Sequence, residues 1–184
     1  VLPIVGITFP TNGQYLNTTT IWVNGTVTEL NKGALQPTTN DTRFNLTYWI
    51  SSTGTFAFKN NVSLSDGRIS LTVSFTDLAG KTGSNSVYFT LDTTLPFVNI
   101  TYPAEGAYLD SIAEIWVNGT VTELNINGQV PTINTTNFTR ILWTPETRVF
   151  AFRNGTAIPD GTLSLMVSFT DLASNTGTAI RTFT

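Results

Sequence analysis

Short segments of alternating apolar and polar residues recur along the chain. The clearest are Ile21 to Thr28 and Arg68 to Thr76, in which almost every second side chain is apolar. Successive side chains of a β-strand point to opposite faces, so each segment is predicted to be a strand with one face on a core. Gly25 falls on the inward face, where we expect it to make room for a bulky residue of the opposing sheet. Trp22 and Asn24 are predicted to point outward.

The rest of the first ninety residues has the same character. Further strands are predicted for Val1 to Pro10, Phe44 to Ile50, Thr55 to Lys59 and Ser86 to Leu91. The long polar stretch Leu30 to Thr42 is predicted to be a loop, and Trp49 with its later counterpart Trp143 to lie in a core. Several short strands with turn signals about every 8 to 12 residues, and no helical period, indicate an all-β protein built from immunoglobulin-like β-sandwiches.

The chain is a tandem repeat. Ile21 to Asn31 returns letter for letter at Ile115 to Asn125, and at this constant offset roughly half of the following positions are identical. We therefore expect two domains, residues 1–91 and 95–184, joined end to end by the linker 92–94, which is too short to act as a flexible tether. Both ends align with interior positions, so the chain is expected to be a piece of a longer array.

Composition excludes several classes of function. Only 11% of residues are charged and the net charge is -3, so nucleic acid is not an expected partner. The chain has no Cys and no His, which removes imidazole bases, thiol nucleophiles and the usual ligands of zinc, copper and haem. No run approaches the roughly 18 to 20 apolar residues of a membrane span, so no span is expected in this segment.

Asparagine is the most informative residue type. Ten asparagines open an Asn-X-Ser/Thr sequon, where the Ser and Thr content alone would give about four. They are Asn17, Asn24, Asn40, Asn45, Asn61, Asn99, Asn118, Asn134, Asn137 and Asn154. This excess favours covalent N-glycans on a secreted protein. The alternative is that a Thr- and Asn-rich β protein collects sequons through its strand and turn composition.

Trp22 and Trp116 each precede a sequon asparagine by two residues. Positions i and i+2 of a strand share a face, so each indole would lie beside the first sugar of a glycan on Asn24 or Asn118. Two alternatives stay open: the loop Leu30 to Thr42 covers Trp22 as ordinary core, or Trp22 contacts a neighbouring subunit. A free-carbohydrate site on these aromatics has no cluster of polar residues behind it.

No catalytic constellation is found in the sequence. The carboxylates that recur in both copies are Glu29 with Glu123, Asp66 with Asp160 and Asp77 with Asp171. Duplication in both domains is typical of structural residues, and the last two pairs lie in turn motifs. Absent histidine excludes a Ser-His-Asp relay, and the second copy, which has no Lys, cannot form a Lys-Asn isopeptide bond. We therefore expect no enzyme activity and no catalytic or cofactor-binding residues.

The chain resembles a known family through its turn motifs. Asp66-Gly-Arg-Ile-Ser-Leu-Thr-Val-Ser-Phe-Thr-Asp-Leu-Ala-Gly80, then a strand and Leu91-Asp-Thr-Thr-Leu-Pro96, is similar to the repeat signature of prokaryotic cell-surface immunoglobulin-like domains. Phe169 to Asn175 repeats part of it. The resemblance implies extracellular repeat modules of S-layer proteins, adhesins, surface filaments or accessory regions of secreted enzymes.

Some members of that family bind calcium between domains. The resemblance makes Asp77 and Asp92 calcium candidates here, with Glu105 or Asp110 as further ligands. Calcium takes about six to eight oxygen ligands, and few are available at this junction. The stronger expectation is that Asp77 and Asp171 accept backbone hydrogen bonds within their own turns.

These observations predict a non-catalytic structural role at the cell surface. The expected function is that of a glycosylated rod in an S-layer, stalk or surface filament, with an archaeal source suggested by dense sequons and absent Cys. Expected partners are neighbouring copies or further repeats of a longer chain. The alternatives are an adhesin or carbohydrate-binding module, and an accessory domain of a secreted enzyme.

Overall fold

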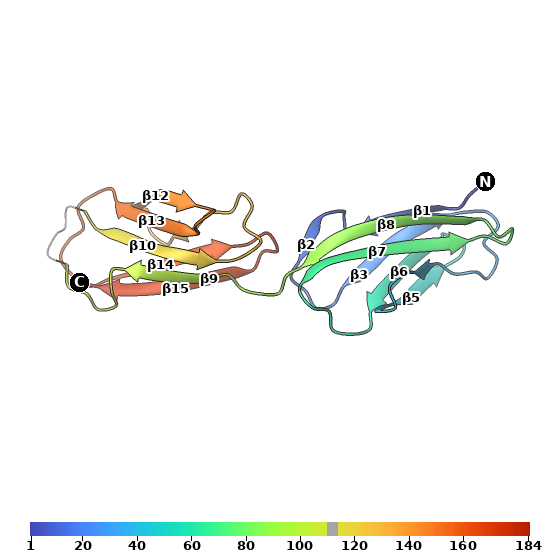
Figure 1. Ribbon diagram of the computed structural model, residues 1–184, viewed down its shortest axis with the longest axis horizontal. Coiled ribbons are helices and arrows are strands. Elements are labelled where there is room, and N and C mark those ends of the chain that lie inside the picture. The colour runs from blue at the N-terminus through green and yellow to red at the C-terminus, as the bar shows by residue number, and fades with distance from the viewer. Residues whose placement is uncertain (110–113) are drawn as a thin grey trace. The chain divides into compact units, whose positions relative to one another are not determined.

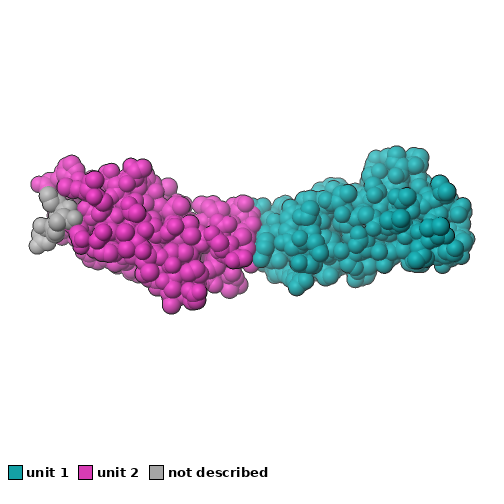
Figure 2. Space-filling view, turned by 90° about the horizontal axis from the view of Figure 1, so that it is seen from above, with its two compact units in different colours: residues 1–93 teal, residues 94–184 magenta. Residues whose placement is uncertain are grey.

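The computed structural model describes residues 1–109 and 114–184, which form two compact units. Unit 1 is Val1–Thr93 and unit 2 is Thr94–Thr184, drawn in teal and magenta in Figure 2. The boundary falls within the segment expected to be a linker. Every regular element in the described residues is a β-strand.

Unit 1 contains two four-stranded sheets. Its strands are β1 (Ile4–Phe9), β2 (Gln14–Leu16), β3 (Trp22–Thr28), β4 (Thr38–Thr39), β5 (Phe44–Ile50), β6 (Thr55–Asn60), β7 (Gly67–Thr76) and β8 (Thr82–Leu91). The sheet orders are β1-β3-β6-β5 and β2-β8-β7-β4. All pairs are antiparallel except β2 with β8, and Figure 1 shows β7 and β8 as the long pair of the second sheet.

The core of unit 1 is built by the alternation seen in the sequence. On β3, Val23 and Val27 are buried while Trp22 and Thr28 are exposed. On β7, each apolar residue from Ile69 to Phe75 is buried. Inward residues of both sheets form one continuous cluster, which identifies the unit as a β-sandwich.

Unit 2 repeats this arrangement. Its strands are β9 (Phe97–Tyr102), β10 (Trp116–Thr122), β11 (Thr132–Ile133), β12 (Phe138–Thr144), β13 (Val149–Asn154), β14 (Leu163–Thr170) and β15 (Thr176–Phe183). The sheet orders are β12-β13-β10-β9 and β11-β14-β15. A parallel bridge between Ala107 and Phe183 takes the place of the β2–β8 pairing. A second apolar cluster fills this sandwich.

Three details differ from the sequence-based expectation. Gly25 makes room for Phe56, but Phe56 lies opposite it on the neighbouring strand β6 of the same sheet, so the opposing sheet is not involved. The last strand of unit 1 begins at Thr82, four residues before the predicted Ser86, because polar residues continue its pairing with β7. The predicted loop 30–42 contains the two-residue strand β4.

The two inward tryptophans follow one pattern. Trp49 and Trp143 are partly buried against their cores, with ring centroids 5.8 Å from Phe75 and 5.6 Å from Phe169. Each indole Nε1 is buried with no hydrogen-bond partner among the described residues. The rings therefore contribute to the cores through apolar and aromatic contacts.

Candidate functional site

The repeated aspartates Asp77 and Asp171 hold their own turns. Asp77 Oδ1 accepts hydrogen bonds from the backbone amides of Ala79 and Lys81 at 2.9 and 2.8 Å. Asp171 accepts from the backbone and side-chain nitrogens of Asn175 at 2.8 and 2.9 Å. These acceptors satisfy turn amides that have no strand partner, so both carboxylates have a structural use.

The repeated glutamates have the same kind of role. Glu29 Oε1 accepts from the amides of Leu30 and Asn31, both at 2.9 Å. Glu123 Oε1 accepts from Leu124 and Asn125 at 2.6 and 2.8 Å. The identical Val-Thr-Glu-Leu-Asn segments therefore encode a strand that ends in a carboxylate-capped turn.

The proposed calcium ligands do not come together in unit 1. Asp77 precedes β8 and Asp92 follows it, and a ten-residue strand is roughly 33 Å long. These two carboxylates therefore cannot ligate the same ion within one unit. Glu105 lies 3.6 Å from Arg181 and accepts from the Thr182 amide at 3.2 Å. Asp110 lies outside the described residues.

Most sequon asparagines lie on the surface of their unit. The exposed ones are Asn17, Asn40, Asn45, Asn61, Asn99, Asn134 and Asn137. Asn24 and Asn118, in the central strands β3 and β10, are half-buried. The acceptors thus reach solvent from several strands and turns in both units.

Asn40 and Asn134 occupy equivalent positions and share one geometry. The backbone amide of Asn40 donates to the Thr72 carbonyl, and its Oδ1 accepts from the Thr72 amide at 2.8 Å. In the same way, the backbone amide of Asn134 donates to the Met166 carbonyl, and its Oδ1 accepts from the Met166 amide at 2.9 Å. Both side chains are held through Oδ1, so Nδ2, the atom that carries an N-glycan, takes no part in these bonds.

Asn154 has a structural role that conflicts with a role as acceptor. It is 5% exposed; its Oδ1 accepts from the Ile115 amide at 2.7 Å and its Nδ2 donates to the Thr156 carbonyl at 3.1 Å. Asn60, its counterpart in unit 1, ties Ile21 to the end of β6 in the same way and is not in a sequon. A glycan on Nδ2 would disturb the bond to Thr156, and the buried side chain leaves little room for a sugar, so this environment does not suit Asn154 as an acceptor.

Trp22 and Trp116 carry a cation over the ring. The ammonium of Lys59 lies 5.4 Å from the Trp22 centroid, and the guanidinium of Arg153 lies 5.4 Å from that of Trp116. Each pair is directly opposed across neighbouring strands. Trp22 stays 38% exposed, which rules out the alternative that the loop buries it as core.

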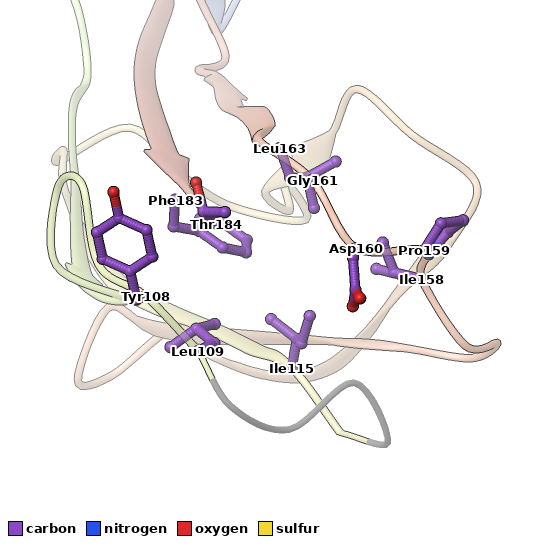
Figure 3. A pocket seen from close by; sticks show the side chains of 10 residues that line it. All are labelled: Tyr108, Leu109, Ile115, Ile158, Pro159, Asp160, Gly161, Leu163, Phe183 and Thr184. Atoms are coloured by element: carbon purple, nitrogen blue, oxygen red, sulfur yellow. The ribbon is translucent and has the colours of Figure 1, made fainter.

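A feature that the sequence patterns did not indicate is a cavity of about 190 Å³ in unit 2. It is lined by apolar residues at the end of β15, with the carboxylate of Asp160 beside it (Figure 3). No helix in the described ranges is long and apolar enough to cross a membrane.

The chain was compared with known proteins. No family model matches it, and no curated protein matches its sequence. Among solved structures, Sidekick-1 immunoglobulin domains 1–5 cover 100% of this chain with 10% identity and a TM-score of 0.52, over 38% of that protein's chain. The fibronectin(III)-like modules of Clostridium thermocellum CbhA cover 98%, over 93% of their own chain, with 14% identity and a TM-score of 0.45. At these identities the likeness concerns the fold alone: this chain is a tandem of two immunoglobulin-like β-sandwiches.

Proposed function

We propose that the chain is a non-catalytic structural module of an extracellular, N-glycosylated cell-surface assembly, such as an S-layer, stalk or filament of the prokaryotic immunoglobulin-like repeat type. The observation that carries the proposal is the paired geometry of Asn40 and Asn134. Both present an exposed sequon asparagine whose Nδ2 stays out of the bonds that fix the side chain. The two repeats have kept this arrangement although only about half of their residues agree.

The carboxylates support a structural role as well. The carboxylates that are repeated at the ends of strands accept hydrogen bonds from backbone amides of the turns, and so they stabilise the fold. Trp22 and Trp116, each two residues before a sequon asparagine, lie under cations on an outer sheet face. We propose that a glycan on Asn24 or Asn118 packs against what remains exposed of these rings, and that neighbouring copies or further repeats are the partners of the chain.

The proposal is tested by mass spectrometry of the protein isolated from its source. We expect an intact mass above that of the polypeptide by hexose-containing increments, and glycopeptides that place glycans on Asn40 and Asn134. The Thr42→Ala variant removes only the Asn40 sequon and should lose one glycan. Thr156→Ala, its matched control, removes the Asn154 sequon and should leave the mass of the glycans unchanged.

An unmodified intact mass would rule out the glycan part of the proposal. A glycan array probed with the same chain separates the adhesin alternative: saturable binding of a free carbohydrate would favour that alternative over a structural module.

A further inference from the structure

Asparagine followed by glycine is a dipeptide that can react with itself. Glycine has no Cβ, so little shields its amide nitrogen from the side-chain carbonyl carbon of the preceding asparagine. The chain contains five such pairs, which are Asn12-Gly13, Asn24-Gly25, Asn118-Gly119, Asn127-Gly128 and Asn154-Gly155. The reaction requires the backbone between the two residues to rotate, so the surrounding structure decides which pair can react.

Three of the pairs are held by regular structure. Asn24 and Asn118 lie within the central strands β3 and β10, which are paired on both sides. The Gly155 amide donates to the Asn137 carbonyl at 2.9 Å, and the buried Asn154 side chain is bonded through both of its polar atoms. Rotation at these pairs would break strand pairing or buried hydrogen bonds, which is costly.

The other two pairs form a matched comparison, because both belong to the tripeptide Asn-Gly-Gln. Each lies in a turn, residues 11–14 or 126–129, that is closed by a backbone hydrogen bond of 3.1 or 2.7 Å between its end residues. Each glycine has a left-handed backbone, with φ of 81° at Gly13 and 74° at Gly128. The local sequence and the conformation of the glycine are therefore alike, and the surroundings differ.

Tyr88 of β8 holds the first of these two pairs. The Gly13 amide donates to the Tyr88 carbonyl at 2.8 Å, and Asn12 Oδ1 accepts from the Tyr88 amide at 3.0 Å. Asn127 and Gly128, in contrast, are both exposed. Within residues 1–109 and 114–184, neither the Gly128 amide nor the Asn127 side chain makes a hydrogen bond. Only the closing bond of the turn opposes rotation of this pair.

We propose that Asn127 is a site of spontaneous modification, at which the chain deamidates itself to aspartate or isoaspartate. The Gly128 nitrogen loses its proton to hydroxide and attacks Cγ of Asn127, and the new N–Cγ bond closes a succinimide ring. The Cγ–Nδ2 bond breaks, and the side-chain nitrogen takes a proton from water, which restores the hydroxide, and leaves as ammonia. Water then opens the ring at either carbonyl, so water is the only co-reactant.

The products change unit 2 in charge and in backbone length. Either product adds a negative charge to a chain whose net charge is -3, and isoaspartate routes the backbone through the side chain, which lengthens the turn. Ile126, directly before the site, packs against the core of unit 2, so a longer turn disturbs that contact. Unit 1 has Gly33 and Ala34 at the equivalent place and cannot react there. The inference goes beyond the structural role proposed above and does not depend on it.

The test compares all of the Asn-Gly pairs in one molecule. The whole unglycosylated chain is kept folded in heavy-oxygen water at mildly alkaline pH, and its peptides are then analysed by mass spectrometry. Deamidation during the incubation incorporates a heavy oxygen, which separates it from deamidation during digestion. We expect Asn127 to react at least about tenfold faster than Asn12, because attack at Asn12 requires both hydrogen bonds to Tyr88 to open first.

Two controls separate the structure from the sequence. In guanidinium chloride, where the chain is unfolded, the two Asn-Gly-Gln tripeptides should react at equal rates, because their local sequence is identical. The Asn127→Gln variant keeps a side-chain amide but would need a larger ring, so its peptide should take up no heavy oxygen. The incubation should lower the Tm of the unsubstituted chain and leave that of this variant unchanged.

Equal rates at Asn12 and Asn127 in the folded chain would overturn the proposal, as would a faster reaction at Asn12. An Asn127 that reacts only after unfolding would overturn it as well. Asn127 lies outside the sequons, so these results do not depend on glycans. A native mass without hexose increments, together with heavy oxygen at Asn127, would refute the glycosylated role and leave this site standing.

Discussion

Gly25 lies directly opposite Phe56 in the register of β3 and β6, and a Cβ atom on Gly25 would come within 2.4 Å of the Phe56 ring and 2.1 Å of the Gly6 carbonyl oxygen. Gly119 stands in the same relation to Phe150 in unit 2, at 2.4 Å. The aromatic ring therefore packs against bare backbone in both units. The two copies keep glycine at this position because no side chain fits.

We expect Gly119→Ala to lower the free energy of unfolding by about 1–3 kcal/mol, the usual cost of overpacking a core. Gly155→Ala is the matched control, because a Cβ there meets nothing within 4 Å and no left-handed backbone is required. Thermal unfolding of both variants checks this. Equal Tm values would show that the Phe150 ring and the Asn99 carbonyl, 2.2 Å from the added Cβ, can both move aside.

Asn60 and Asn154 are expected to be needed for stability. Asn154→Ala leaves the buried Ile115 amide without its acceptor, which costs about 1–3 kcal/mol. Asn45→Ala, at an exposed sequon asparagine, should change the free energy of unfolding by less than about 0.5 kcal/mol. Denaturant unfolding of the unglycosylated protein compares the two variants. An equal loss of unfolding free energy would show that the Ile115 amide finds another acceptor when Asn154 is removed.

Arg181 takes in unit 2 the inward position that Val87 takes in unit 1. Its guanidinium donates to the Ile100 carbonyl and lies 3.6 Å from Glu105, while its Nε is buried with no partner among the described residues. Replacing a partly buried ion pair by an apolar side chain is often neutral or stabilising. We expect Arg181→Val to leave the free energy of unfolding unchanged or to raise it by about 1 kcal/mol.

The reciprocal change should not be tolerated. Asn12 is the counterpart of Glu105 in unit 1, so Val87→Arg would bury a cation without a carboxylate. We expect it to lower the free energy of unfolding by roughly 2–4 kcal/mol. Denaturant unfolding measures the free energy of unfolding of both variants. If Val87→Arg left it as little changed as Arg181→Val, a nearby carboxylate such as Glu105 would not be needed to hold an arginine at this position.

Asp41 is expected to make the stability of unit 1 depend on pH under acidic conditions. The Arg43 guanidinium donates hydrogen bonds to the Asp41 carboxylate, and the distance between Arg43 Nη2 and Asp41 Oδ2 is 2.6 Å. These hydrogen bonds hold the pKa of Asp41 below its ordinary value of 3.8. A pKa depressed by folding contributes stability that is present above the unfolded pKa and is lost as the pH falls through the folded pKa. The contribution should therefore be complete at neutral pH, begin to fall near pH 4, and be lost as the pH drops through the lower pKa of the folded state.

Carboxyl NMR titration checks this prediction. Arg43→Met should raise the pKa of Asp41 toward its ordinary value and make unfolding less dependent on pH in this range. Because Arg43 is exposed, the loss of stability at pH 7 should stay below about 1 kcal/mol. An unchanged Asp41 pKa in the variant would show that the guanidinium is not its cause.

The strands and the inward faces could be predicted from the sequence because alternation with a period of two fixes which side chains share a face. Val23, Val27, Leu71 and Val73 were assigned to the core in this way and are buried. The ends of strands were less accurate, because the polar residues from Thr82 onward pair through the backbone alone. The turn roles of Asp77 and Asp171 followed from their motif.

Other features depended on which residues meet in space. The sequon motif could not distinguish Asn154, whose amide atoms are used by Ile115 and Thr156, from Asn134, whose Nδ2 is left out of its bonds. The family resemblance, which made Asp77 and Asp92 calcium candidates, likewise did not show that the two residues lie at opposite ends of β8. Burial and partners are set by packing, which a local motif does not contain.

The sequence by itself determined the repeat, the all-β class and the faces of the main strands, because these depend on periodicity along the chain. Only the tertiary structure decided which asparagines reach solvent and which aromatic ring needs a glycine. These properties arise from contacts between segments distant in sequence, and a side chain's accessibility is fixed only when those segments meet.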